Sequence, residues 1–302
     1  MLTIFYACSS NRTQVQKDVE IVPVEIENAT KDVSLFLEKI EIIPLETIDS
    51  SLVHKCNKVI YDEKMDIYAI YTREQIVYTF TGDGKFVDNS RRVKGQGPEE
   101  YYMVVDVNFN THLNGIDMLN PYGTIYTYTP NFELLLKRKV DMEFPVDHFI
   151  SLKSDEYVFT YPYLWTDPEV VFFNLKTKHI DNVNYDGTIA GGNTMEHECF
   201  RKVNNDFYFV PTGVNYYCYR IDVEKKDLVP ILYLDFGKEE INEEELPGCG
   251  WGRKNETDKE KQEIVEDFKE RYYFLRNSNH IIPSIKFFNN DYVYIFMQYC
   301  PK

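Results

Sequence analysis

Few residues in this 302-residue chain have the types and spacing that catalysis or metal binding requires. Glu196, His197 and Glu198 are adjacent and could supply a base or metal ligands, but one histidine between two carboxylates is more often a solvated turn. The cysteines after position 8 are scattered and form no close pair of the kind that binds zinc. The sequence therefore assigns no catalytic residue, no metal and no cofactor.

The aromatic and polar side chains that the repeat pattern places in loops suit a protein that binds a ligand without catalysing a reaction. Flat rings stack on sugar faces or on side chains, while amides and guanidinium groups fix a ligand's orientation. The candidate ligand-binding residues are Arg73, Arg91, Gln96, Tyr122, Tyr163, Trp165, Asn215 and Trp251. For each residue taken alone, an ordinary turn position is the competing interpretation. Trp251 lies among glycines and could equally belong to a flexible linker.

A repeat of short strands and tight turns predicts where these loops lie. The turn after each aromatic-rich strand begins at positions 81, 129, 175 and 223, so consecutive turns are 48, 46 and 48 positions apart. The first turn contains the sequence GDG (82–84), which is a strong hairpin signal. Four-stranded units with a period in the forties are typical of β-propeller blades. The sequence thus predicts an all-β propeller with four consecutive antiparallel blades.

The third strand of each predicted blade has bulky side chains on both faces, as expected when neighbouring sheets cover both sides. These strands are IVYTF (76–80), TIYTY (124–128), VVFFN (170–174) and YYCYRI (216–221). In the first blade, the remaining strands are expected at 58–60, 67–71 and 85–87. Nearly all of these aromatic side chains are expected to form the core between blades.

Two kinds of loop emerge on the same face of a propeller: those joining second to third strands, and those joining one blade to the next. RRVKGQGPEEY (91–101) is predicted to link the first two blades, because Gly95, Gly97 and Pro98 interrupt the alternating pattern. We therefore expect the candidate binding residues to gather on this face, around the central funnel.

An insertion at about 238–278 interrupts the repeat and ends in a predicted helix, which Thr257 and Glu260 open with capping-box spacing. The apolar stripe that would dock this helix on the propeller consists of Ile264, Phe268, Tyr272 and Leu275. IIPSIKFF and DYVYIFMQY then predict two strands of a fifth blade. Residues 21–26 and 37–45 are expected to be extended, the second as an edge strand because it contains Pro44.

Composition argues against two kinds of partner. The formal net charge of −16 disfavours nucleic acid, whose binding depends on basic side chains. No run of eighteen apolar residues occurs, so no helical membrane span is expected. Cys199 and Cys218 could form a disulfide in an oxidising compartment. The favoured interpretation is that both cysteines serve as small apolar residues on strands.

The first ten residues, MLTIFYACSS, resemble the end of a bacterial lipoprotein signal in which Cys8 bears the lipid. The apolar run is short and lacks a basic start, so the true start is expected upstream. The polar residues that follow predict a flexible tether, which makes 1–36 a signal remnant with tether and 37–302 the propeller domain. By similarity to lipoprotein sorting rules, Ser9 in place of Asp after Cys8 points away from retention in the inner membrane, so the outer membrane is the expected location. An ordinary frayed terminus is the alternative.

Several segments together resemble the six-bladed β-propeller lipoproteins of Bacteroidetes-type bacteria, a family mostly of unassigned function. They are IPLET (43–47), FTGDGKFV (80–87), GQGPEEY (95–101) and YRI followed by LYLDFGK, which ends at Lys238. The GQGP loop is the most specific, because turns like GDGKF occur in many NHL-like propellers. The resemblance implies a six-bladed ring, of which this chain holds about four and a half blades. A C-terminal truncation or an open ring is expected, with 37–45 as the closing strand.

Two functions stay open at this point. The first is a cell-envelope lipoprotein, attached to the membrane only through Cys8, that binds a glycan, a peptide or an envelope protein through loops of one face. The second is a propeller enzyme, a lyase or hydrolase acting on glycan or peptide. Fold alone does not separate them. Binding is favoured because the loops supply no converging acid, base or metal set; a cluster of histidine and carboxylates at the funnel would reverse that order.

Overall fold

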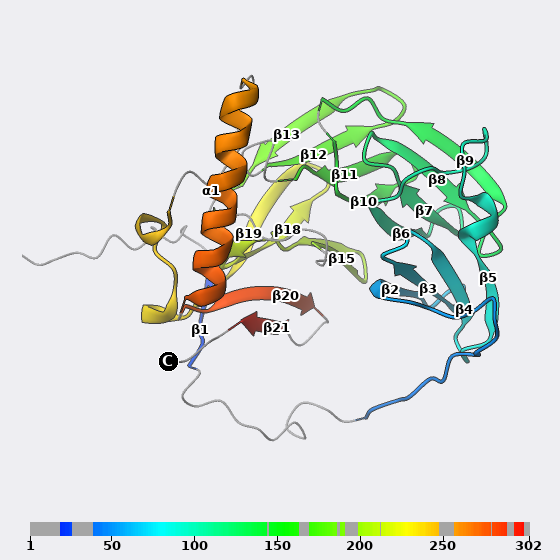
Figure 1. Cartoon of the computed structure of the whole chain (residues 1–302), viewed down its shortest axis with the longest axis horizontal. Helices are drawn as coiled ribbons and strands as arrows, with labels where there is room; N and C mark the ends of the chain where they lie inside the picture. The colour runs from blue at the N-terminus through cyan, green and yellow to red at the C-terminus, as the bar shows by residue number, and fades with distance from the viewer. Residues whose placement is uncertain are drawn as a thin grey trace, which may run out of the picture.

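The computed structural model describes residues 19–25, 39–143, 145–162, 169–185, 188–190, 199–211, 213–247, 257–278, 280–288 and 293–298. Successive antiparallel sheets follow one another in an arc, as blades do around an axis (Figure 1). The predicted all-β propeller architecture with four-stranded blades is confirmed. In the described part of the chain, no helix combines the length and the apolar character needed to cross a membrane.

The first blade shows how the sequence pattern becomes a sheet. Its strands are β2 (Cys56–Asp62), β3 (Ile67–Thr72), β4 (Val77–Thr81) and β5 (Phe86–Asn89), paired antiparallel in that order. In the turn between β4 and β5, Gly84 N donates a 2.8 Å hydrogen bond to Thr81 O. Gly84 has a φ of 86°, a conformation that glycine adopts without strain. The predicted hairpin is therefore confirmed.

The second and third blades repeat this design. The second contains β6 (Asp106–Asn110), β7 (Gly115–Leu119), β8 (Thr124–Tyr128) and β9 (Leu134–Lys139). The third contains β10 (His148–Lys153), β11 (Glu156–Thr160), β12 (Glu169–Asn174) and β13 (Ile180–Asn184). In each sheet the strands pair antiparallel in sequence order.

The fourth blade gains a strand from the N-terminal part of the chain. Its strands are β15 (Phe200–Val203), β16 (Asp206–Phe209), β18 (Tyr217–Asp222) and β19 (Asp227–Asp235). β1 (Glu20–Pro23) adds to β19 in parallel. Residues 21–23 are extended, as predicted for 21–26, and they take an edge position in the sheet, where a strand can end in proline. β14 (Thr188–Ala190) and β17 (Val214–Asn215) form a separate two-stranded sheet.

One backbone feature marks the predicted period. Phe132, Lys178 and Lys226 have φ angles of 53°, 58° and 54°, and each lies between the third and fourth strands of its blade, as Gly84 does. From Gly84 onward these residues are 48, 46 and 48 positions apart. Left-handed backbone at the same place in four blades confirms the repeat as a structural one.

Beyond the fourth blade, α1 (Asp258–Asn277) begins as predicted, because Thr257 and Glu260 form a reciprocal capping box. Leu275 is buried with residues of the fourth blade, while the side chains of Ile264, Phe268 and Tyr272 lie outside the described part. β20 (Ile282–Phe288) and β21 (Val293–Gln298) form the predicted antiparallel pair. The described residues thus contain four blades of four strands, the fourth extended by β1, together with the two-stranded sheets β14–β17 and β20–β21.

The edge strand predicted at 37–45 does not form in its described part. Residues 39–48 have no regular secondary structure, and Ile40 and Ile42 are 73% and 86% exposed. The chain crosses the turn between β4 and β5, where Glu46 N donates to Gly84 O at 2.8 Å. A Cβ at position 84 would lie 2.2 Å from Pro44 O, so glycine is needed there for this crossing as well. Residues 39–48 therefore form isolated hydrogen bonds with the turn between β4 and β5, and they do not pair with a strand edge.

The third blade packs on both of its neighbours, as the two-sided apolar pattern predicts. In β12, Val171 and Phe173 join a core with second-blade residues, whereas Val170 and Phe172 join a core with the fourth blade. This alternation follows from the opposite directions of successive side chains in a strand. Burial of one large apolar side chain stabilises the fold by roughly 1.5–3 kcal/mol, so the cores between blades hold the arc together.

Candidate functional site

The first strand of each blade lies at the inner side of the arc, and these four strands border a hollow. Its volume is about 590 Å³, which is within the range of small-molecule sites. We term it the axial hollow. The walls comprise Ile60, Tyr61, Asp62, Glu63, Lys64, Asn108, Phe109, Thr111, Ile150, Ser151, Phe200, Arg201, Lys202, Val203 and Asn204. These wall residues come from all four blades.

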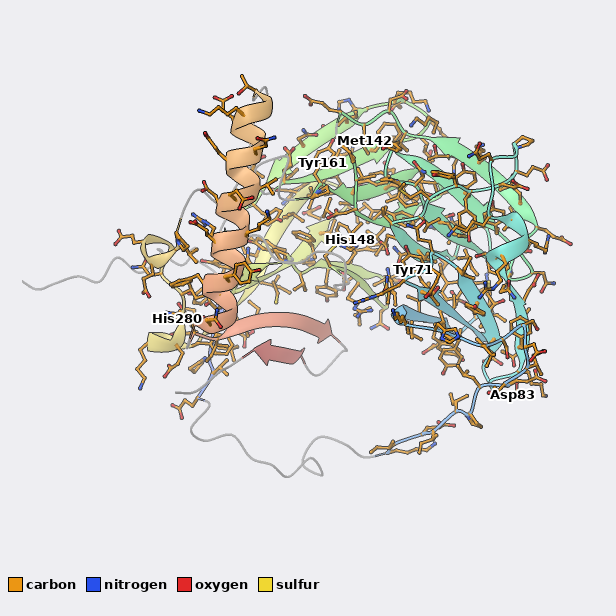
Figure 2. All side chains as sticks on the ribbon, in the orientation of Figure 1. Tyr71, Asp83, Met142, His148, Tyr161 and His280 are labelled. Carbon is orange, nitrogen blue, oxygen red and sulfur yellow. The ribbon has the colours of Figure 1, made fainter. Side chains whose placement is uncertain are left out.

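The same inner strands carry a group of polar side chains, which we term the axial belt: Lys58, Asp106, Asn108, His148 and Arg201. Asp106 and His148 are buried, and the other three are half-buried. Lys58 Nζ lies 2.7 Å from Asp106 Oδ1 and 3.0 Å from Asn108 Oδ1. Arg201 and Asn108 also line the axial hollow, so belt and hollow are continuous. Figure 2 shows His148 at the inner side of the arc, whereas Asp83 lies at its periphery.

Asp106 links three blades at the axis. Its carboxylate pairs with Lys58 from the first blade and accepts hydrogen bonds from Phe149 N of the third blade at 3.2 Å and from Val107 N at 2.8 Å. Burial would raise the pKa of Asp106, but the charges of Lys58 and His148 and their hydrogen bonds hold it at about 2. Asp106 is therefore ionised at neutral pH, with its oxygens engaged by donors.

The other titratable groups at the axis respond to burial in different ways. Burial would lower the pKa of His148, but the carboxylates of Asp147 and Asp106 outweigh it and raise that pKa. Burial lowers the pKa of Arg201 to about 10, which leaves the guanidinium charged at neutral pH. Burial raises the pKa of the Cys199 thiol well above its usual value, so this cysteine is a poor nucleophile.

Metal binding finds no support in the described residues, where no three histidine, cysteine or acidic side chains are grouped to hold an ion. Glu196, His197 and Glu198 lie outside the described residues. Cys199 and Cys218 are both buried free thiols, so the alternative of a disulfide between them is not realised.

A second buried carboxylate, Asp117 on β7, lies between the second and third blades instead of at the axis. It pairs with Arg138 at 2.9 Å and accepts hydrogen bonds from Thr127 Oγ1, Asn110 Nδ2 and Tyr157 Oη. Burial raises the pKa of Asp117 against the opposing effects of Arg138 and the other donors. None of these five residues lines the axial hollow.

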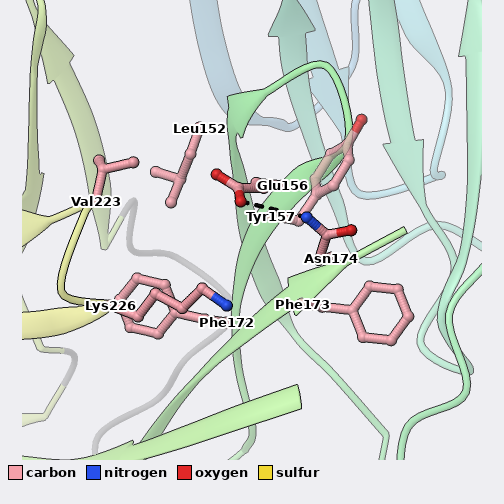
Figure 3. Close-up of a pocket in the computed structure, with 8 residues that line it drawn as sticks. All are labelled: Leu152, Glu156, Tyr157, Phe172, Phe173, Asn174, Val223 and Lys226. Carbon is pink, nitrogen blue, oxygen red and sulfur yellow. Dashed lines mark hydrogen bonds between the residues drawn. The ribbon is translucent and has the colours of Figure 1, made fainter. Parts of the chain in front are cut away.

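Figure 3 shows a second and much smaller cavity, between the third and fourth blades. Its volume is about 10 Å³, which leaves room for roughly one water molecule. Asn174 Nδ2 donates to Glu156 Oε1 at 3.2 Å across its wall (Figure 3). This cavity is a gap in packing and is too small to hold a metabolite.

The candidate residues taken from the loops do not gather at the axial hollow. Arg73, Arg91, Gln96 and Tyr122 are exposed, and none of them lines it. The register of β2 with β3 pairs Asp62 with Ile67 and Cys56 with Thr72, so the turn at 63–66 borders the hollow while Arg73 lies at the opposite end of the sheet. The expected binding face and the hollow are therefore opposite ends of the blades.

Three of the loop candidates have specific positions. Arg91 donates to Tyr78 Oη at 2.6 Å and holds the linker between blades on the first sheet. Asn215 is fully buried, and its Oδ1 accepts a hydrogen bond from Tyr217 N at 2.7 Å, so it supports a turn. Tyr122 is 64% exposed at the turn between β7 and β8. Tyr163, Trp165, Trp251 and Cys8 lie outside the described residues.

Sequence reasoning missed the axial belt because it searched the loops. A signal was available: Lys58 and Asp106 are charged residues 48 positions apart, which is the first spacing of the repeat, and each directly precedes a valine, Val59 or Val107. A charge at equivalent inner-strand positions of two blades predicts that both face the axis, where opposite charges can pair.

Comparison with known proteins identifies a family and a fold but no activity. A family model described as a domain of unknown function, DUF4934, matches residues 19–299. No curated protein sequence matches the chain.

Among solved structures, a Bacteroides fragilis protein whose name classes it as a candidate exported protein has a TM-score of 0.61 at 16% identity. The match covers 86% of this chain and 70% of that one. The WD40 β-propeller domain of Doa1 has a TM-score of 0.38 at 12% identity, over 56% of this chain and 50% of that one. PorZ, a surface component of the type-IX secretion system of Porphyromonas gingivalis, has a TM-score of 0.37 at 9% identity, over 59% and 22%.

Proposed function

The chain belongs to the DUF4934 family, and we propose that it is an exported propeller that binds a small ligand in its axial hollow. The observation that carries the proposal is the hollow of about 590 Å³ bordered by the inner strands of four blades. Most of its wall belongs to hydrogen-bonded strands and the remainder to the tight turns between them, so a site of this kind is pre-formed. Its lining mixes apolar, aromatic, amide, hydroxyl and charged groups, as ligand sites do.

Catalysis by a lyase or hydrolase is the weaker proposal, even though His148 lies beside Asp106 at the axis. A general base needs an oxygen or nitrogen that is open to the substrate and has a pKa near the working pH. The pKa of Asp106 is about 2, and its oxygens are engaged by Lys58, two backbone N–H groups and Asn108. This carboxylate is suited to fixing charge at the axis and not to moving protons.

Location in the cell envelope belongs to the same proposal. Its support is the name of the similar Bacteroides fragilis protein, together with the lipoprotein-like start around Cys8. The finer assignment is a six-bladed NHL-like lipoprotein of the outer membrane whose partner is a glycan, a peptide or an envelope protein. Metabolic labelling with a fatty acid tests the anchor. Label that persists in Cys8→Ser would contradict it.

The binding proposal is tested by thermal-shift screening of the full chain against a mixed panel of envelope saccharides and short peptides. We expect at least one compound to raise the Tm of the wild-type protein, since a ligand that binds only the folded state stabilises it. Ser151→Trp and Thr111→Trp each place a bulky ring in the hollow and should abolish that shift. Tyr122→Ala, at the opposite end of the blades, should leave it unchanged.

The same variants decide between the two ends of the propeller. Loss of the shift in Tyr122→Ala with retention in both tryptophan variants would contradict binding in the hollow and favour the loop face. Circular dichroism on each variant checks that the fold is retained. If one of the two tryptophan variants misfolds, the other still tests the hollow.

A further inference from the structure

The first blade exposes an apolar side chain at a position that is buried in the next two blades. Val59, Val107 and Phe149 each directly follow a residue of the axial belt in the inner strand of their blade. Val107 and Phe149 are 1% and 0% exposed, because each belongs to a core shared with the preceding blade. Val59 is 51% exposed, and no preceding sheet among the described residues covers it. The repeat thus keeps an apolar residue here where its neighbours need one for packing.

Val59 belongs to an apolar face of the first sheet, which we term the free face: Val59, Tyr61 and Tyr68. Val59 pairs across the strands with Ile70, whose core is separate from the one shared with the second blade, and Tyr61 pairs with Tyr68. Cross-strand partners lie on the same side of a sheet. The Tyr61 and Tyr68 rings stack with centroids 4.4 Å apart, and Tyr61 is 43% exposed. Val53 packs with Ile70 and with residues of β4 and β5, which leaves the inner strand β2 open.

The free face has the character of a surface that packs on another sheet. A sheet face that stays in water normally carries polar side chains, whereas this one presents a β-branched residue and two stacked rings. The first blade lies at one end of the arc of four blades, and its other face packs on the second blade (Figure 1). A partner sheet could therefore approach the free face without displacing a blade.

The border of the free face is nearly balanced in charge, although the whole chain carries a net charge of −16. The turn between β2 and β3 lies against the turn between β4 and β5, since Gly82 N donates to Asp66 O at 2.8 Å. Asp83 pairs with Lys85 at 2.8 Å. The charged residues of the two turns are Glu63, Lys64, Asp66, Asp83 and Lys85. Three acidic and two basic groups give a local charge of only −1, so a second copy of this acidic chain would meet little repulsion here.

We propose that the free face is the interface of a twofold-symmetric dimer, in which the free faces of two copies of this chain pack on each other. A twofold contact needs one apolar surface, because the same residues serve both copies. Stacked sheets pack face to face through side chains of this kind, as the blades themselves do. A head-to-tail contact would need a second complementary surface and would extend beyond two copies. Tyr61 also borders the axial hollow, so the hollow of each copy adjoins the interface.

The test is sedimentation equilibrium of the full chain from about 1 μM to about 100 μM, a range that covers a dimer of moderate affinity. We expect the wild type to approach twice the mass of one chain. Val59→Asp should raise the dissociation constant of the dimer by about a hundredfold or more, because the contact would bury two unpaired carboxylates. Val59→Thr keeps the side-chain shape and should raise it by about tenfold, since it buries two hydroxyl groups.

The matched control is Ile180→Asp, which changes a β-branched residue that is 42% exposed on β13 of the third blade. It should associate like the wild type. All three substitutions lie at half-exposed positions, and circular dichroism checks that each variant folds; if Val59→Asp does not, Val59→Thr still tests the face. A wild type that stays monomeric over the whole range overturns the inference. So do assemblies larger than a dimer, an unchanged dissociation constant in the folded Val59 variants, or an equal loss in Ile180→Asp.

Discussion

The second blade holds two buried carboxylates whose surroundings differ. Asp106 at the start of β6 faces the axis, pairs with Lys58 of the first blade and has a pKa of about 2. Asp117 on β7 lies between sheets, pairs with Arg138 of its own blade, and its pKa is raised by burial. Both are fixed by at least three donors, so hydrogen bonding alone does not distinguish a scaffold from a site.

What separates the two carboxylates is access to open space. The Asp117 network is enclosed between two sheets, because Asp117 and its partner Tyr157 of the third blade are both fully buried. The Asp106 network continues through Asn108 and Arg201 into the wall of the axial hollow. The comparison assigns Asp117 to stability and the axial belt to an electrostatic environment that a ligand would meet.

The largest effect is expected at the enclosed pair. Arg138→Met leaves Asp117 buried without its cation and should cost about 3–5 kcal/mol of unfolding free energy, measured by urea denaturation. The double variant Asp117→Leu/Arg138→Met removes both charges and should recover most of that loss. A cost below about 1 kcal/mol for Arg138→Met would show that the pair is not part of the scaffold.

A smaller loss is expected at the axis. Lys58→Met removes the cation from Asp106 but leaves the N–H groups of Val107 and Phe149 and the Asn108 amide. The cost should be about 1.5–3 kcal/mol by the same urea measurement, because the carboxylate keeps donors. A loss as large as that of Arg138→Met would remove the difference between the two networks.

Acid titration distinguishes the two carboxylates, because the pKa of Asp106 is lowered in the folded protein and the pKa of Asp117 is raised. The pKa of Asp106 is about 2 in the folded protein, below its usual value of 3.8, so its stabilisation is present above about pH 4 and is lost as the pH falls through 2. Asp106→Asn should flatten this acid limb by up to about 2 kcal/mol. The raised pKa of Asp117 acts in the opposite direction, since its folded form takes up a proton first.

The control for that titration is Asp117→Asn, which should make the acid limb no shallower than in the wild type. Equal flattening in both variants, measured by urea unfolding between about pH 5 and pH 2, would contradict the opposite pKa shifts.

The smallest effect is expected from reducing agent. Cys199 near the axis and Cys218 in β18 are buried free thiols, so dithiothreitol should not shift the Tm. Labelling of the native protein followed by peptide mass spectrometry should modify Cys56, which is exposed, and spare both buried cysteines. A Tm that falls on reduction would indicate a disulfide between Cys199 and Cys218, which would contradict this prediction.

Local chemistry made the blades predictable. Each turn between the third and fourth strands requires left-handed backbone at one residue, and that need recurs with the hydrophobic pattern at Gly84, Phe132, Lys178 and Lys226. The docking of β1 on β19 was not predictable, because it joins segments more than two hundred positions apart in a parallel register. The same holds for the crossing of Glu46 over Gly84, which depends on one close backbone approach.

The site was harder to predict than the fold for a physical reason. A charged residue on a half-exposed strand normally faces solvent, so Lys58 and Arg201 look ordinary in the sequence. Their convergence depends on the arrangement of the four blades around an axis, which brings together inner strands as far apart in the sequence as positions 58 and 201. Loop residues such as Tyr122 and Gln96 attract notice by type, yet the structure places them away from the hollow.

Hydrogen–deuterium exchange with the panel compound that raises the Tm most is the direct test of binding in the axial hollow. The account predicts slower exchange at the turns that border the hollow, residues 63–66, 111–114 and 204–205, and in the inner strands β2, β6, β10 and β15. Residues 73–76, 120–123 and 91–101 at the opposite end should exchange as in the free protein. Protection confined to those opposite loops would contradict the account.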